Sequence, residues 1–351
     1  FNSKYCIMVN SGSSANLLMI AAMFFTKDKT KRFSRGDEVI VPAVSWSTTY
    51  FPLQQYGLKL VFVDIDSETL NFNLENLRSA ITSKTRAILA VNLLGNPNDF
   101  IAINSLIKGK DITLLEDNCE SMGSQIEDRY TGTYGLMGTF SSFFSHHIAT
   151  MEGGYILTDD EELYHIILSL RAHGWTRNLP KENHVTGIKS DDPFEESFNF
   201  VLPGYNLRPL EMSASVGIEQ LKKLPSFLSY RRTNAKYFQE IFSDHPFISI
   251  QKEIGKSSWF GFSLILKNDS PINRKELVQT LFKNNIECRP IVTGNFLKNK
   301  SVLKFFEYRV SGTLKNAEHL DSNGLFVGNH HFDISEKIKY LKSVLDDPQF
   351  K

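Results

Sequence analysis

The feature that most constrains the fold is a repeated alternation of short apolar runs and segments with helical spacing. The apolar runs are rich in valine, isoleucine and leucine and include residues 37–42, 59–64, 87–93 and 112–117. Strands that are apolar on both faces are typical of a parallel sheet with helices on either side. The segments between them that have helical spacing are residues 48–56, 74–81 and 100–108. The sequence therefore predicts an α/β fold with a mostly parallel central sheet and helices on both faces.

The pattern continues along the chain and then changes. Further strands are expected at residues 6–9, 140–145 and 154–158, and further helices at residues 15–25, 161–172, 211–227 and 231–242. Residues 179–199 are polar and irregular, which predicts a loop. From about residue 257 the alternation in residues 259–266 indicates a strand of a smaller α+β domain. We expect a large domain over residues 1–230 and a smaller one over residues 231–351. Because the chain starts almost directly in a strand, we also expect an upstream segment.

Composition excludes several classes of function. Lysine plus arginine and aspartate plus glutamate both number 39, so no basic field favours nucleic acid or a membrane surface. The longest apolar stretches are too short to cross a bilayer, and no signal peptide pattern begins the chain. The three cysteines, Cys6, Cys119 and Cys288, lie far apart, which is typical of a reducing cytoplasm. An iron–sulfur cluster held by one chain usually needs four cysteines, so none is expected.

Gly12, Ser13 and Ser14 turn the first strand into a helix. Free backbone N–H groups and the positive end of a helix form a site for an anion such as phosphate. The same residues, taken alone, are also typical of an ordinary helix cap.

Asp117 ends an apolar strand, where a buried carboxylate needs a partner. A protonated pyridine nitrogen is a suitable partner, and a capping or ion-paired role is equally consistent. Trp46 follows the strand at residues 37–42 and is placed to stack on such a ring or to pack in the core.

The stretch at residues 140–154 combines Ser141, Ser145, His146 and His147 with a Glu-Gly-Gly sequence. Hydroxyl groups at a strand end can hold phosphate, and His146 is a candidate base. Adjacent side chains on a strand point to opposite faces, so the two histidines are not expected to bind one metal ion. Asn206, in the loop at residues 203–209, is placed either to reach a neighbouring subunit or to form a turn.

Taken in order, these motifs resemble the DegT/StrS family of sugar aminotransferases, which are pyridoxal phosphate enzymes of fold type I. The resemblance runs from residue 1 to about residue 330, and it rests on the motifs at residues 11–16, 46, 116–120, 140–154 and 204–208. It implies that Gly12, Ser13 and Ser14 bind the cofactor phosphate through their backbone, helped by the Ser141 hydroxyl.

The resemblance assigns the other cofactor contacts as well. It implies that Trp46 stacks on the pyridine ring, that Asp117 pairs with the ring nitrogen, and that Glu120 stands where many relatives have glutamine. Asn206 would contact the cofactor phosphate of the neighbouring subunit, which implies a homodimer with shared active sites.

His146 is the departure from the family pattern, because aminotransferases have a lysine there. A histidine moves protons but cannot hold the cofactor aldehyde covalently. In this respect the chain resembles the 3-dehydratases that act on nucleotide-linked 4-keto-6-deoxy sugars. One such enzyme uses a CDP-linked sugar and also carries an iron–sulfur cluster on four cysteines, which this chain cannot supply. Residues 145–154 and 171–180 resemble the branch that uses a GDP-linked sugar.

The resemblance therefore implies loss of the C3 hydroxyl of GDP-4-keto-6-deoxy-D-mannose, giving a 4-keto-3,6-dideoxy sugar for O-antigen or lipopolysaccharide synthesis. The cofactor would work as pyridoxamine phosphate, with His146 as base and L-glutamate regenerating the amine. Open alternatives are a nucleotide-sugar aminotransferase that recruits another lysine, a 3-dehydratase for the CDP-linked sugar, and a relative without catalytic activity.

Overall fold

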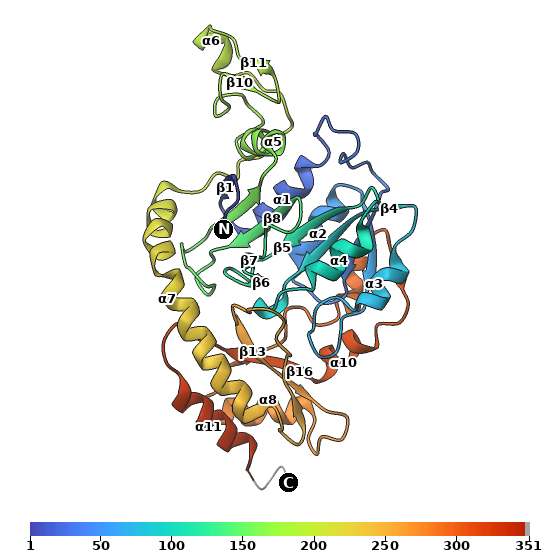
Figure 1. The fold of residues 1–351 in the computed structure, drawn as a ribbon, viewed down its shortest axis with the longest axis vertical. Coiled ribbons are helices and arrows are strands. Elements are labelled where there is room, and N and C mark those ends of the chain that lie inside the picture. The colour runs from blue at the N-terminus through green and yellow to red at the C-terminus, as the bar shows by residue number, and fades with distance from the viewer. Residues whose placement is uncertain (348–351) are drawn as a thin grey trace.

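The computed structural model describes residues 1–347, which form a large and a smaller sheet connected by the long helix α7 (Figure 1). The large sheet has the strand order β1-β9-β8-β5-β4-β2-β3-β15. Its strands are β1 (Tyr5–Val9), β2 (Glu38–Pro42), β3 (Lys59–Val63), β4 (Thr85–Val91), β5 (Thr113–Asp117), β8 (Met137–Ser141), β9 (Gly154–Thr158) and β15 (Tyr308–Ser311). Only β9 runs antiparallel to its neighbours β1 and β8, and the other neighbouring pairs are parallel. The predicted fold class is confirmed.

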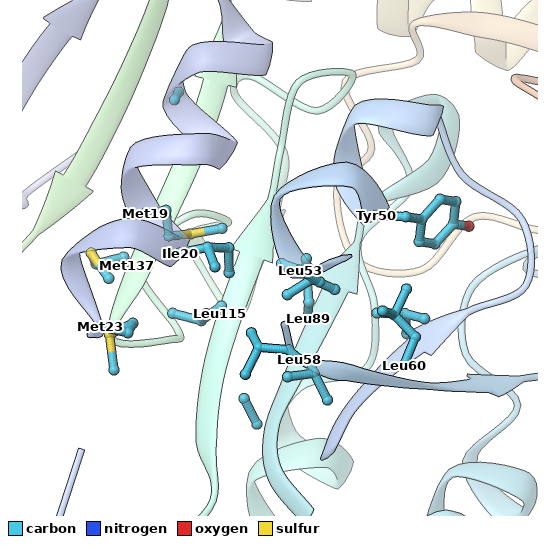
Figure 2. Close-up of a cluster of buried hydrophobic side chains, with 14 of the residues drawn as sticks. Met19, Ile20, Met23, Tyr50, Leu53, Leu58, Leu60, Leu89, Leu115 and Met137 are labelled. Atoms are coloured by element: carbon cyan, nitrogen blue, oxygen red, sulfur yellow. The ribbon is translucent and has the colours of Figure 1, made fainter. Parts of the chain in front are cut away.

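Two apolar cores enclose this sheet, one on each face. Val39 and Val41 of β2 pack in the core beneath α1, α2 and α5, whereas Ile40 packs beneath α3 and α4. This alternation follows from the strand geometry, in which successive side chains point to opposite faces. Figure 2 shows part of the first core, including Leu53 of α2 and Leu115 of β5. The covering helices are α1 (Gly12–Ala22), α2 (Ser47–Gln55), α3 (Leu74–Ala80), α4 (Phe100–Ile107) and α5 (Glu161–Arg171).

Side-chain caps fix where several of these helices begin. Ser11, Asp99 and Asp160 each accept a hydrogen bond from the backbone N–H of the residue three positions later. Such a cap contributes about 1 kcal/mol. For α1, the cap places the start of the helix directly after β1, where the sequence predicts an anion site.

The smaller sheet has the order β12-β13-β16-β14. It contains β12 (Ile248–Ser249), β13 (Gly261–Leu266), β14 (Cys288–Arg289) and β16 (Gly324–Gly328), and it packs with α7 (Glu211–Phe242), α8 (Arg274–Lys283) and α11 (Ser335–Leu345). Phe238 of α7 stacks on Phe262 of β13, with ring centroids 4.3 Å apart. This sheet and its helices agree with the α+β pattern expected after residue 257.

The C-terminal part of the chain also contributes to the large sheet. Strand β15 pairs in parallel with β3, so that Tyr308 lies opposite Leu60. Phe296 and Leu320, the latter in α10 (Lys315–Asn323), belong to the larger core. The predicted domain division at residue 230 falls inside α7, and it stays a prediction.

Two predicted elements differ from the structure. The strand expected at residues 140–145 ends at Ser141, because Ser141 is the last residue paired with β9 and the chain then loops away. The two helices expected at residues 211–227 and 231–242 are one helix, α7. Pro225 lies inside it. A proline in a helix loses one backbone hydrogen bond and crowds the carbonyl group four residues earlier, and α7 nevertheless continues through this position.

Residues 179–199 form an arm that projects from the large domain (Figure 1). The loop predicted here contains the short elements β10 (Glu182–Asn183), β11 (Gly187–Ile188) and α6 (Pro193–Glu196). The remaining short elements are β6 (Gln125–Ile126), β7 (Arg129–Tyr130), α9 (Lys300–Leu303) and the 3-10 turns Leu93–Gly95 and Phe296–Lys298. Within residues 1–347, no helix is long and apolar enough to span a membrane.

Candidate active site

Asp117 is the last residue of β5, and neighbouring elements fix its carboxylate. Oδ2 accepts hydrogen bonds of 2.8 Å from Asn16 Nδ2 of α1 and from Thr49 Oγ1 of α2. Oδ1 accepts one of 3.1 Å from the backbone N–H of Cys119. Thr139 Oγ1 in turn donates to Asn16 Oδ1 at 2.6 Å. A buried carboxylate held in one orientation by neutral donors suits a cationic partner such as a protonated pyridine nitrogen.

The N-terminus of α1 lies against the end of β8. A Cβ atom added to Gly12 would come within 2.7 Å of Ser141 Cβ and 3.0 Å of Cys119 Sγ, so glycine is needed for this approach. The N–H of Ser14 already donates to Ser11 Oγ at 3.1 Å, which leaves the earlier N–H groups of the first turn to bind an anion. Gly12, Ser13 and Ser141 thus form a cradle of the kind that a phosphate group needs.

Trp46 and Glu120 are two further residues that are predicted to contact the cofactor. Trp46 precedes α2 and is 56% exposed, so the indole face is free to stack on a ring. Ser13 Oγ donates to Thr48 Oγ1 at 2.9 Å, which ties the start of α1 to the start of α2 beside Trp46. Glu120 Oε2 accepts a hydrogen bond of 2.9 Å from the N–H of Leu94. With Asp117 and the α1 cradle, these residues fit a pyridoxal phosphate group.

His146 lies in the loop between β8 and β9, five residues after the end of β8 and not directly after a strand as predicted. Its N–H donates to the carbonyl oxygen of Phe143 at 2.9 Å, and its ring contacts the rings of Phe143 and Phe260 at centroid distances of 5.9 and 5.1 Å. Nδ1 is buried without a partner among the described residues. Burial, with a smaller effect from the Arg231 guanidinium, lowers the pKa of His146 to about 4. The ring is therefore neutral at pH 7, as a base requires.

A cavity of about 1140 Å³ opens beside His146. The charged residues that line it are mostly cationic and include Lys223, Arg231, Arg289 and Lys337. A second cavity, of about 660 Å³, lies at the amino ends of β2, β4 and β5 and contains none of the predicted site residues. The first cavity is large enough for a small-molecule ligand and places it next to the candidate base, and of the predicted site residues only His146 lines it.

Asn206 lies between the arm and α7 in the chain, and within residues 1–347 its side chain makes no hydrogen bond with the other predicted residues. Its side chain is exposed, and its Oδ1 accepts a hydrogen bond of 3.2 Å from Arg208 Nε. The neighbouring Leu207 carbonyl accepts from the N–H of Asn10, at the end of β1, at 3.0 Å. This exposure agrees with the predicted contact to a neighbouring subunit, which stays a prediction.

Sequence reasoning missed Asn16, Thr49, Thr139 and Phe260. Asn16 gave a signal, since it is a polar residue in the apolar helical run at residues 15–25. No such signal marks Thr49, Thr139 or Phe260, because threonine in a helix or strand and phenylalanine in an apolar run are common. Their roles depend on contacts between segments that are far apart in the sequence.

Glu120→Gln tests the electrostatics of the site. Burial raises the pKa of Glu120 to about 7, so the folded state holds a proton that the unfolded state has lost between pH 4.5 and 7. Stability should therefore fall as pH rises through this window. Relative to the variant, the wild type should lose on the order of 1 kcal/mol of unfolding free energy between pH 5 and 8, because water near this half-buried group screens part of the effect. Urea unfolding at several pH values measures this. Glu240→Gln, at an exposed site on α7, is the control, and parallel curves for Glu120→Gln and wild type would contradict the prediction.

The chain belongs to the DegT/DnrJ/EryC1/StrS aminotransferase family, and the match covers residues 1–341. It is 70% identical over 345 residues to the GDP-4-keto-6-deoxy-D-mannose 3-dehydratase of Yersinia pseudotuberculosis, a match that covers 98% of this chain and 87% of that protein. It is 67% identical over 345 residues to the enzyme of the same name from Escherichia coli O55:H7, covering 98% and 88%.

Solved structures agree with these relationships. The Escherichia coli GDP-4-keto-6-deoxy-D-mannose 3-dehydratase with bound hydrated pyridoxal phosphate is 66% identical and gives a TM-score of 0.97, covering 99% of this chain and 88% of that one. Two further structures of an enzyme of this name give the same identity and TM-score, covering 99% of this chain and 89% of theirs. One is a histidine-to-asparagine variant with bound GDP-perosamine, and the other holds a trapped pyridoxal phosphate–glutamate geminal diamine.

Proposed function

We propose that this chain removes the C3 hydroxyl of GDP-4-keto-6-deoxy-D-mannose and yields a 4-keto-3,6-dideoxy sugar. The observation that carries the proposal is the neutral, half-buried His146 at the position where family aminotransferases have lysine, in a chain that also has the phosphate cradle of Gly12, Ser13 and Ser141. A chain that kept the cradle but has histidine in place of the lysine can still move protons, but it cannot hold the cofactor aldehyde covalently as an ordinary transaminase does. The identity of 70% to a relative of this activity supports the substrate.

Each residue has a defined task in this reaction. Gly12, Ser13 and Ser141 bind the cofactor phosphate and Trp46 packs on its ring, whereas the N–H of Ser14 is already bonded to Ser11. Bound pyridoxamine phosphate supplies an amine and an electron sink.

Asp117 pairs with the ring nitrogen and is held for this by Asn16 and Thr49. Glu120 accepts a hydrogen bond from the N–H of Leu94 and thereby helps to hold the backbone near the site. His146 accepts a proton at an imidazole nitrogen and, once protonated, donates it to the departing C3 hydroxyl. One imidazole serves both steps because it is neutral at rest.

Glutamate is the proposed amino donor. Two structures of relatives support glutamate and a GDP-linked sugar as ligands. A relative binds GDP-perosamine, a GDP-linked sugar, and another structure holds a glutamate adduct of the cofactor. The cationic cavity beside His146 suits ligands of this kind, since both carry negative charge.

The test is to incubate the protein with pyridoxal phosphate, glutamate and either GDP-4-keto-6-deoxy-D-mannose or the CDP-linked keto sugar. We expect a product from the GDP-linked sugar whose mass corresponds to loss of the C3 oxygen. Steady formation of an amino sugar would instead identify an aminotransferase. That alternative would need a lysine at the cofactor, and Lys223 and Lys337 line the cavity that contains His146.

We also propose that two copies of the chain form a homodimer. Large apolar side chains that are more than half exposed gather on the arm and at the start of α7: Ile188, Phe194, Phe198, Phe200, Leu210 and Met212. Exposed apolar surface of this extent is typical of an interface. Asn206 lies in the same stretch of chain, so a partner seated there would meet it. This geometry supports an active site shared between subunits.

Met212→Glu should separate the subunits. Met212 is 74% exposed in one chain, and a buried carboxylate in an interface has no partner to offset its desolvation. We expect the dissociation constant of the dimer to rise by roughly thirtyfold or more, equivalent to about 2 kcal/mol. Light scattering over a dilution series measures this. Phe282→Glu, at an exposed apolar position on α8, is the control. A Met212→Glu protein that remains dimeric at the same concentrations would contradict the proposed interface.

We further propose a cytoplasmic location and a role in the synthesis of lipopolysaccharide sugars. The nucleotide-linked substrate and the glutamate donor are cytoplasmic metabolites in this proposal. Comparison of lipopolysaccharide sugars with and without the gene tests the role, since loss of the 3,6-dideoxy sugar is expected.

A further inference from the structure

His147 makes one hydrogen bond, and this bond determines the tautomer of its ring. The side chain is 3% exposed, and Nε2 lies 3.1 Å from the carbonyl oxygen of Ser258. A carbonyl oxygen only accepts hydrogen bonds, so Nε2 carries the proton and Nδ1 does not. Nδ1 is buried and has no partner in the described part of the chain. Burial also holds the pKa of His147 well below its usual value. A neutral ring with a fixed tautomer and no second partner anchors the backbone and has no route by which to relay a proton.

The segment that receives this hydrogen bond is itself held firmly. The N–H of Ser258 lies 3.1 Å from both the carbonyl oxygen of Gly95 and Ser124 Oγ, and the two serine hydroxyls are 2.9 Å apart. Gly95 has a φ of +89°, and a Cβ atom there would meet Trp259 N at 2.8 Å. The backbone at Gly95 and the backbone at residues 258–259 are therefore in close contact. Ser258 is thus a fixed point for the loop that carries His147.

The same segment contacts the candidate base. The Phe260 ring lies 5.1 Å from the ring of His146 and 5.8 Å from that of His147. The N–H of Phe260 donates to the carbonyl oxygen of Leu94 at 2.9 Å, and the N–H of Leu94 donates to Glu120. Glu120 follows Asp117 by three residues. Residues 258–260 thus connect the position of both histidines to the strand end that carries Asp117.

We propose that His147 is a positioning residue for dehydration, whose hydrogen bond to Ser258 holds the His146 ring against Phe260 and toward the cofactor site. The inference rests on the proposed function, since it takes His146 as the base. A displacement of about 1 Å of a reacting group typically costs on the order of 10²-fold in rate. Loss of the anchor should therefore reduce kcat and leave substrate binding nearly unchanged.

Two substitutions separate the hydrogen bond from the volume of the ring. His147→Phe keeps an aromatic ring but has no donor, whereas His147→Gln keeps an N–H donor. We expect His147→Phe to lower kcat by roughly 10- to 100-fold, with KM for the sugar nucleotide within about threefold of wild type. His147→Gln should recover most of the rate. Both variants should bind pyridoxal phosphate with the wild-type absorbance spectrum.

Each outcome decides one question. Wild-type kcat in His147→Phe, or a raised KM with unchanged kcat, would overturn the positioning role. A wild-type protein that turns over no sugar nucleotide would overturn the proposed function instead.

The hydrogen bond of His147 can also be tested without turnover, by ¹⁵N NMR of histidine-labelled protein. His147 should show a proton on Nε2 and none on Nδ1 at pH 7, and the His146 resonances should move in His147→Phe but not in His147→Gln. A proton on Nδ1 of His147 would contradict the inference even if neither variant folds.

Discussion

Replacing His146 with asparagine is expected to slow dehydration by roughly 10²–10⁴-fold while the cofactor remains bound. Asparagine is polar and of similar reach, but it does not take up a proton near neutral pH. The phosphate cradle, Trp46 and Asp117 are untouched, so binding of pyridoxal phosphate should be unchanged. Single-turnover dehydration and the absorbance of the bound cofactor measure the two effects separately. His319→Asn, on α10, is the control for a histidine outside the cavity.

The pH dependence gives a second view of the same residue. Because burial lowers the pKa of His146 to about 4, the wild-type rate should persist at pH values where an ordinary histidine would be protonated.

His146→Lys should abolish dehydration and retain the cofactor covalently after borohydride reduction, as mass spectrometry would show. A His146→Asn protein with the wild-type dehydration rate would refute the assignment of the base.

Replacing Asp117 with asparagine should weaken the cofactor site. The variant keeps the shape of the side chain but loses the charge that favours a protonated ring nitrogen. Hydrogen bonds to charged groups contribute about 1.5–3 kcal/mol, so we expect pyridoxal phosphate to bind roughly 10- to 150-fold more weakly. Dehydration should fall further than binding, since the ring also loses its capacity to accept electrons.

Titration of the protein with pyridoxal phosphate, followed by absorbance and by melting temperature, measures the affinity. Asp37→Asn removes a carboxylate that accepts a hydrogen bond from Ser34 at the amino end of β2, far from the predicted site, and serves as the matched control. Equal affinities in Asp117→Asn and wild type would show that the aspartate does not pair with the ring.

Much of the fold was predictable because each strand and helix carries its own signal. The strands from β2 to β5 are apolar on both faces, and this alone predicts a sheet covered by helices. Strand β15 was not predicted, because residues 308–311 are not an apolar run and only their pairing with β3 makes them a strand. Its position depends on tertiary contacts, which no local pattern records.

The candidate site was predictable where a residue type is unusual for its place. Asp117 at the end of a buried strand and His146 before Glu-Gly-Gly are unusual in this sense. The strand predicted at residues 140–145 was placed too far along the chain, because Phe143 and Phe144 look like strand residues but belong to the loop after β8. The surroundings of His147 were not predictable from sequence either, because its one hydrogen bond is to the carbonyl group of Ser258, more than a hundred residues away.

Strand β15 has a consequence for synthesis of the chain on the ribosome. Until residue 311 has left the exit tunnel, β3 is an edge strand with unpaired N–H and C=O groups along one side. At about 5–20 residues per second, this edge stays open for on the order of ten seconds or more after β3 itself has emerged. Such an edge invites pairing with another nascent chain. A protein cut off before residue 308 would keep it permanently, and we expect such a truncated product to aggregate rather than to fold.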